Sequence, residues 1–177
     1  MPDKITFADR GSSVEIIRTW FGAKFVIFTA FAAVWGGFLV FWYGEAVSRG
    51  NMLMLLFPIL HVEIGAAVTY YAVAGWLNRT QVYADARGLF IRHRSVPWFG
   101  NKDIPAEDLK QLYVKEKRMH GRGGSYPVYE ARAVTRSGRN VKIVGGLDEP
   151  EQGIFIEQKI EKFFEIENAP VPGEVGR

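Results

Sequence analysis

The chain contains no cysteine and only three histidines among its 177 residues. Because cysteine is absent, disulfides and thiolate-bound metal sites are excluded, and a reducing compartment fits the composition. The other polar residues form no Ser/His/Asp set, no paired carboxylates suited to a cleft and no dinucleotide fingerprint. The sequence therefore predicts that the protein is not an enzyme and carries no cofactor and no metal.

Charge is absent from two long stretches of the chain. Phe25 to Tyr43 has no charged residue, and Met52 to Leu77 is interrupted only by His61 and Glu63. A helix that spans a bilayer needs about 20 apolar residues, whereas a soluble core helix shows a polar stripe. We expect a two-helix transmembrane hairpin within residues 20–78, with helices at about 20–43 and 52–77.

The residues that flank these segments predict their orientation. Trp20 and Trp76 mark one end of the pair, and Trp42 with Tyr43 marks the other, as aromatic residues do at membrane interfaces. Four basic residues precede the first segment closely, four follow the second, and one lies in the connecting loop. The positive-inside rule then places both termini, including residues 1–19, in the cytoplasm.

His61 and Glu63 are the polar residues of the second segment. Residues two apart project about 200° apart on a helix, so the two cannot ligate one metal. One of them can face the first helix, and the other then faces lipid or a second protein. We expect at least one to meet a partner chain or a bound lipid; proton transfer is the alternative, although a relay needs more titratable groups. The expected intramembrane partner contacts are His61, Glu63, Trp35 and Tyr70.

Small residues on the two helices predict close helix packing. Small side chains let two membrane helices approach closely. The expected packing residues are Thr29, Ala33, Gly36, Gly37 and Gly65.

After residue 78 the chain becomes charged and strand-like. Short β-branched and aromatic stretches separated by turns predict two hairpins, joined by a helical turn and a flexible loop at 119–127. Residues 148–164 have an apolar helical face, with Asp148 expected as the N-cap. We expect a cytoplasmic domain at 79–167 and a flexible tail at 168–177.

Positive charge is concentrated in the strand-like part. Residues 79–142 contain 14 Lys and Arg against 6 Asp and Glu, whereas residues 143–168 contain 2 against 7. Such a surface can rest on anionic headgroups, or it can be an ordinary solvated exterior. The candidate headgroup or partner contacts are Arg92, Arg94, Lys115, Lys117, Arg118 and Arg122.

The stretches "NRTQVYADARGLFIRH", "IPAEDLKQLYV" and "YEARAVTRSGRNVKIVGGL", followed by a helix, resemble the membrane-anchored branch of the bacterial pleckstrin-homology-like (PH-like) domain proteins. The resemblance implies an α+β membrane protein with a bent antiparallel sheet, nearly a barrel, closed by a C-terminal helix. Five or six strands are visible where the family fold has seven. "SVEIIR" at residues 13–18 is a hypothetical source of a missing strand.

Two functions remain open, both in a bacterial inner membrane. The first is an accessory subunit that packs against a larger membrane complex, for example a photosynthetic or respiratory one. The alternative is a free-standing adaptor whose basic domain binds anionic lipid headgroups or a cytoplasmic protein. Nucleic-acid binding is not expected, because the basic residues lack interleaved aromatic platforms.

Overall fold

The computed structural model describes residues 1–121 and 124–175. The chain forms two compact units. Trp20–Asn78 makes the helical unit, and Met1–Thr19 together with Arg79–Arg177 makes the strand-rich unit. The N-terminal segment is therefore part of the same unit as the residues that follow the helices.

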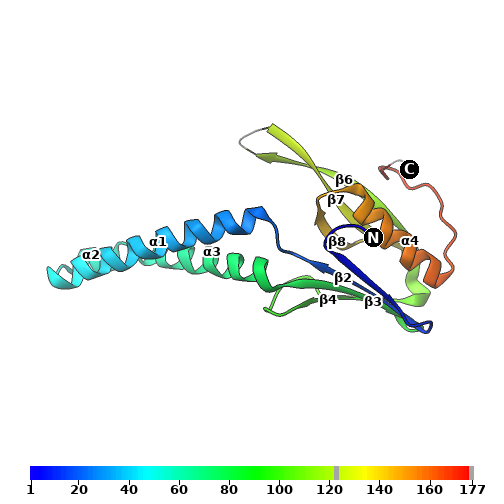
Figure 1. Ribbon diagram of the computed structural model, residues 1–177, viewed down its shortest axis with the longest axis horizontal. Coiled ribbons are helices and arrows are strands. Elements are labelled where there is room, and N and C mark those ends of the chain that lie inside the picture. Colours follow the sequence, from blue (N-terminus) through cyan, green and yellow to red (C-terminus); the bar gives the residue numbers. More distant parts are fainter. Residues whose placement is uncertain (122–123, 176–177) are drawn as a thin grey trace. The chain divides into compact units, whose positions relative to one another are not determined.

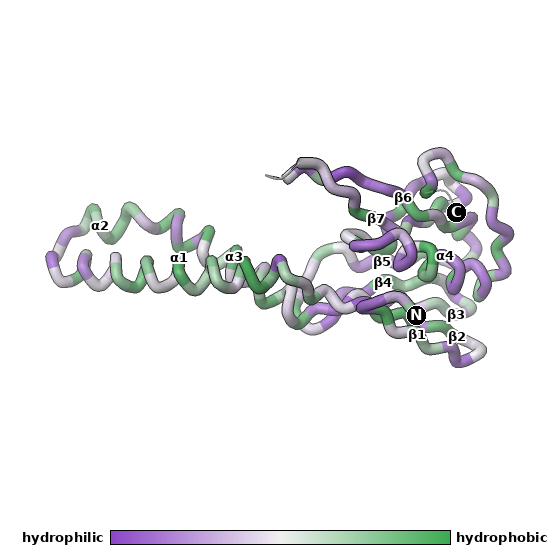
Figure 2. The backbone as a smooth tube through the Cα atoms, turned by 45° about the horizontal axis from the view of Figure 1, so that its top comes forward, coloured by the Kyte–Doolittle hydropathy of each residue, from purple (hydrophilic) through white to green (hydrophobic). Residues whose placement is uncertain are grey.

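The helical unit contains two long apolar helices, α1 (Ala23–Ser48) and α3 (Ile59–Leu77), and a short helix α2 (Met52–Leu56) between them. Figure 2 shows apolar colouring along these helices. By length and composition, Ala23–Ser48 and Met52–Leu77 could each cross a membrane. This is consistent with the two expected spans, although α1 runs from Ala23 to Ser48 rather than from 20 to 43.

The second apolar segment is not one continuous helix. α2 ends at Leu56, and α3 begins after Pro58. Pro58 has no N–H to donate to the carbonyl of Met54, four residues earlier, and that carbonyl instead accepts from the Trp42 indole (2.9 Å). Asn51 caps α2, since its side-chain oxygen accepts from the N–H groups of Leu53 (3.1 Å) and Met54 (3.3 Å).

The first sheet of the strand-rich unit is antiparallel with the order β1-β2-β3-β4-β5. Its strands are Ile5–Asp9, Ser13–Thr19, Arg79–Asp85, Gly88–Arg94 and Lys102–Pro105. The hypothesis that residues 13–18 supply a strand is confirmed, because β2 pairs with β3 along its whole length. β1 and β5 were not expected from the sequence.

The second sheet is also antiparallel, in the order β6-β7-β8. Its strands are Leu109–Gly121, Gly124–Thr135 and Asn140–Leu147. The expectation of a flexible loop at 119–127 is wrong for the described residues, because Met119 pairs with Tyr126 and Gly121 with Gly124. The apolar alternation that predicts these two strands ends before residue 119, because the outer parts of the strands are too polar to show it.

Helix α4 (Pro150–Phe164) packs against both sheets and completes the core (Figure 1). Ile156 and Ile160 are fully buried with Ile16 of β2 and Leu112 of β6. The N-cap is Glu149 rather than the expected Asp148. Asp148 lies just before the helix, and its N–H donates to the Gln152 side chain (3.2 Å). No side chain among the described residues caps the N-terminus of α4.

The C-terminal residues also differ from the expected flexible tail. The Val175 N–H donates to the Val114 carbonyl (2.8 Å), and the backbone of Glu174 forms an isolated antiparallel β-bridge with that of Lys115 in β6. A strand edge offers unpaired backbone groups that attract such a segment. The protein is thus an α+β chain with two long apolar helices, two antiparallel sheets and a C-terminal helix.

Candidate functional site

The centre of the helical unit is built around Trp35 and His61. Trp35 is the thirteenth of the 26 residues of α1, about 18 Å from either end of that helix. Its indole N–H donates to the His61 carbonyl oxygen (3.1 Å), and the two rings stack with centroids 5.7 Å apart. His61 therefore faces α1. Its Nδ1 is buried and has no hydrogen-bond partner in the described residues.

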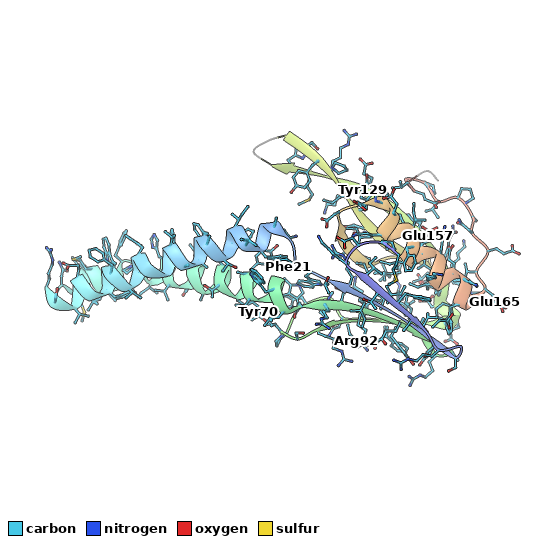
Figure 3. The ribbon with its side chains drawn as sticks, viewed as in Figure 1. Phe21, Tyr70, Arg92, Tyr129, Glu157 and Glu165 are labelled. Carbon is cyan, nitrogen blue, oxygen red and sulfur yellow. The ribbon has the colours of Figure 1, made fainter. Side chains whose placement is uncertain are left out.

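Glu63 lies on the other side of α3 and is exposed. No hydrogen bond or ion pair reaches its carboxylate within residues 1–121 and 124–175. Tyr70, the other expected contact on this helix, is 44% exposed (Figure 3). The predicted separation of His61 and Glu63 onto different faces therefore holds in the structure, and it is Glu63 that points outward.

The close contacts between α1 and α3 use small residues of α3. A Cβ added at Gly75 would lie 1.9 Å from the Phe25 ring, and one at Gly65 would lie 2.9 Å from the Trp35 ring. Gly65 therefore lies in the helix contact, as expected. Thr29 takes part through its hydroxyl, which accepts from the Trp76 indole (2.8 Å) and donates to the Phe25 carbonyl (2.7 Å).

The other three expected packing residues of α1 make no such close contact. Added Cβ atoms at Gly36 and Gly37 meet nothing within 4 Å, and Ala33 is exposed. Gly36 instead lines an apolar groove of about 580 Å³, together with Trp35, Leu39, Gly65 and others. Because bulky Phe25 and Trp35 face the small residues of α3, the close approach does not need small residues on α1.

Arg92 and Arg94 lie at the end of β4. Arg92 donates to the carbonyls of Ile91 and Lys102 (both 3.0 Å) and forms an ion pair with Asp103, which lowers the pKa of that carboxyl (Figure 3). Its position in this network is structural. Arg94 is exposed, and its Nε donates to the Gln81 side chain (3.0 Å).

A long antiparallel ribbon carries the other cations. We call residues 115–121 with 124–128 the arm. Lys115, Lys117 and Arg118 are exposed on it, and Arg118 forms an ion pair with Glu116 (3.4 Å). Met119 and Tyr126 pair across the arm and are 41% and 53% exposed. Arg122 lies outside the described residues.

A second exposed feature was not identified from the sequence. Residues 95–101 connect β4 to β5, and Phe99 in this loop is 89% exposed, next to Trp98. The two adjacent aromatic residues between Pro97 and Gly100 could have predicted it, because large rings in a short loop have no core of their own to enter.

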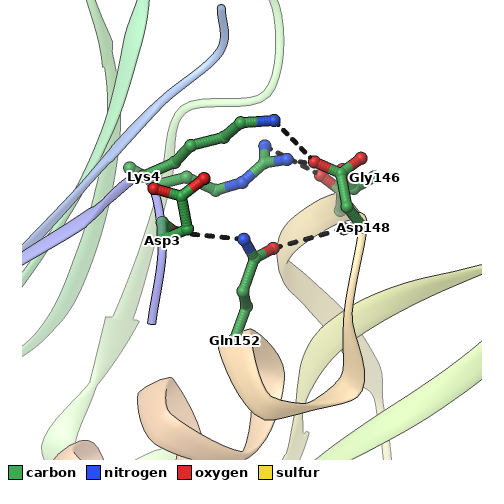
Figure 4. Close-up of polar contacts among 7 residues, drawn as sticks. Asp3, Lys4, Gly146, Asp148 and Gln152 are labelled. Atoms are coloured by element: carbon green, nitrogen blue, oxygen red, sulfur yellow. Dashed lines mark hydrogen bonds and ion pairs between the residues drawn. The ribbon is translucent and has the colours of Figure 1, made fainter. Parts of the chain in front are cut away.

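Several polar side chains join the N-terminal strands to the start of α4, although the buried Nε of Arg18 has no hydrogen-bond partner in the described residues. Arg18 of β2 donates to the carbonyls of Gly145 and Gly146, and burial lowers its pKa although Asp148 acts in the opposite direction (Figure 4). Lys4 pairs with Asp148 at 2.8 Å, and the Gln152 amide donates to the Asp3 carbonyl at 3.0 Å. These contacts fasten the N-terminal strands to the start of α4.

Across the described residues, no group of three or more His, Cys, Asp or Glu side chains could hold a metal ion. Comparison with models of known protein families finds no match, and comparison with curated proteins finds no significant match. The features available for binding are the outward carboxylate of Glu63 and the exposed cationic and aromatic residues of the strand-rich unit.

Proposed function

We propose that this chain is a membrane-anchored interaction subunit without enzymatic activity. α1 and α3 span a bacterial inner membrane, and the chain packs against a larger membrane complex through the outer face of α3. The strand-rich unit acts as a PH-like cytoplasmic binding domain. Two antiparallel sheets closed by a C-terminal helix support that resemblance.

The exposed carboxylate of Glu63 is the observation that carries this proposal. Gly65, two residues away, packs on Trp35 at the midpoint of α1, so Glu63 lies near the middle of the apolar hairpin. A carboxylate at the centre of a bilayer costs about 2.5–3.5 kcal/mol by insertion scales. A partner helix that donates a hydrogen bond or a cation to Glu63 removes much of this cost.

His61 supports the proposal less directly. Its Nδ1 lacks a partner but is covered by the chain's own atoms. A second protein cannot reach that nitrogen in this conformation, in which the Trp35 and Phe57 rings pack against the His61 ring. Glu63, not His61, is therefore the residue assigned to the partner.

The arm favours a second candidate, a free-standing adaptor that binds anionic headgroups or a cytoplasmic protein. Lys117 and Arg118 are exposed on it. A basic residue near an anionic membrane contributes about 1 kcal/mol. The adaptor needs no partner at Glu63, so a substitution of Glu63 should distinguish the two functions.

The test replaces Glu63 with leucine and extracts the full chain from its membrane in mild detergent. We expect the wild type to run as a particle with several chains, and Glu63→Leu to lose at least one of them. Glu63→Gln should retain part of the association because it keeps a hydrogen-bonding group. Val62→Leu, at the neighbouring exposed position, is the matched control and should behave as the wild type does.

Two results would contradict the subunit proposal. One is a wild-type particle near 20.0 kDa plus detergent. The other is a Glu63→Leu variant that keeps every co-purifying chain. Either result favours the adaptor.

A further inference from the structure

The loop at residues 95–101 exposes Phe99 and holds Trp98 beside it, half-buried. Phe99 is the most exposed large apolar side chain among the described residues, and its ring centroid lies 6.4 Å from that of Trp98. An exposed phenylalanine of this kind has a cost in water, because its apolar area is not buried. The loop is therefore a candidate contact with an apolar phase.

Two features hold the ends of this loop together, a hydrogen bond and the close approach of Gly100 to His93. The His93 N–H donates to the Asn101 side-chain oxygen (2.8 Å), which ties the two ends together. Gly100 has φ +104°, and a Cβ there would lie 3.2 Å from His93 Nε2. Because a held loop has less conformational entropy to lose, contact by its tip costs less.

Strand register places this loop at one defined end of the first sheet. Thr19 of β2 pairs with Arg79 of β3, and Arg79 pairs with Arg94 of β4. Thr19 is followed by the residues that lead into α1, and Arg79 is separated from the end of α3 only by Asn78. β3 begins directly after α3, and β4 runs antiparallel to it. The last residue of β4, Arg94, therefore lies beside the first residue of β3, and the loop begins at that end of the sheet.

The covalent chain limits the distance from the loop to the end of α3. Two residue steps from Leu77 to Arg79 span at most about 8 Å, and paired Cα atoms in antiparallel strands lie about 5 Å apart. The Cα atom of Arg94 is therefore within about 13 Å of the helix end. Four or five further residues, at up to about 3.5 Å each, give the chain enough length for Trp98 and Phe99 to reach across a headgroup layer.

Basic residues surround the base of the loop. Arg79 and Arg94 are exposed at the strand ends, and the Lys102 ammonium donates to the Lys142 carbonyl (2.8 Å). Burial lowers the pKa of Lys102, the nearby charges of Lys142 and Arg132 lower it further, and Glu130 acts in the opposite direction. Aromatic residues beside such charge match the boundary between anionic headgroups and acyl chains.

We propose that residues 95–101 form an interfacial anchor. Trp98 and Phe99 enter the headgroup–acyl boundary of the bilayer, and Arg94 with its basic neighbours contacts anionic lipid phosphates. The anchor ties the strand-rich unit to the membrane surface at a second point besides the chain itself. This proposal rests on the membrane-spanning role of α1 and α3 given above, but it does not need the partner at Glu63.

The test uses the absence of native cysteine to place one fluorophore at a time on the full chain in nanodiscs. Phe99→Cys carries the label at the proposed anchor. Ala86→Cys is the matched control, because Ala86 is exposed in the turn at the far end of the same two strands, about 20 Å away. Val34→Cys, exposed on α1, reports whether the helices are in the bilayer.

With nitroxide-bearing lipids, we expect the labels at Phe99 and Val34 to lose most of their fluorescence and the label at Ala86 to lose little. Replacing part of the phosphatidylcholine with phosphatidylglycerol should increase quenching at Phe99, and Arg94→Gln should reduce that increase. These outcomes together support the anchor.

The three labels distinguish a failure of the anchor proposal from a failure of the membrane-spanning premise. If Val34 is quenched and Phe99 is quenched no more than Ala86, the anchor proposal is overturned and the loop is left to a protein partner. If Val34 is not quenched, the membrane-spanning premise fails, and the anchor fails with it. If phosphatidylglycerol has no effect on Phe99, the assignment of the cations to headgroups is wrong.

Discussion

His93 is half-buried near the end of β4, with its Nδ1 3.1 Å from the Thr80 hydroxyl. Burial lowers its pKa, and the positive charges of Lys102 and Lys142 lower it further. The folded protein therefore takes up a proton on His93 less readily than the unfolded chain, in which a histidine titrates near 6.5. Between the lowered folded pKa and about 6.5, the unfolded state binds more protons, so stability falls as the pH falls through this window.

Replacing His93 with glutamine should therefore weaken the pH dependence of stability. We expect the drop in Tm of the strand-rich unit between pH 7.5 and 5.5 to be smaller in His93→Gln than in the wild type, as measured by thermal unfolding of the full chain in detergent. His120→Gln, on the exposed arm, is the control and should retain the wild-type drop. An unchanged drop in His93→Gln would show that other groups control stability in this range.

At the scale of elements, β2 joins two parts of the chain that the helices separate in sequence. Its residues alternate, with Val14 and Ile16 buried at 4% and 1% exposure and Ile17 only half-buried. Ile16 packs in the core with residues of both sheets and of α4. The N-terminal segment is therefore a structural part of the strand-rich unit.

Ile16→Ala should destabilise the strand-rich unit by about 2–5 kcal/mol, because it removes a fully buried side chain and leaves a cavity. Ile17→Ala is the matched control on the opposite face of the same strand and should cost clearly less. Denaturant titration of the full chain, followed through protease resistance of the strand-rich unit, measures both. Equal losses in the two variants would mean that β2 does not enter the core as described.

At the scale of the whole molecule, the pairing of β2 with β3 constrains the proposed membrane topology. β2 precedes both apolar helices and β3 follows them. Two paired strands lie in the same compartment, so the chain between them must cross a bilayer an even number of times. Two spans satisfy this condition, and one span does not.

Single-cysteine labelling in sealed vesicles should report this topology. Ser12→Cys in the β1–β2 turn and Ser137→Cys in the β7–β8 turn should react from one side, and Ser48→Cys at the end of α1 from the other. All three positions are exposed, so differences in reactivity report sidedness rather than burial. Finding Ser48 and Ser137 on the same side would rule out the two-span arrangement.

Several features follow from neighbouring residues alone. The apolar helices follow from runs without charge, the different faces of His61 and Glu63 follow from helical geometry, and α4 follows from its apolar period. Each of these signals lies within one segment, so it can be read without knowing what that segment packs against.

Other features were decided only by tertiary structure. The sequence did not show that β1 and β5 would form, that Gly75 rather than Gly36 would meet a bulky residue of the other helix, or that Phe99 would be left outside the core. Strand partners and exposure depend on contacts between residues far apart in the chain. The free energy of such contacts cannot be predicted from the pattern of neighbouring residues. The sequence by itself thus determined the two apolar helices, α4 and most of the strands, whereas the tertiary structure decided how the strands pair and which side chains remain at the surface.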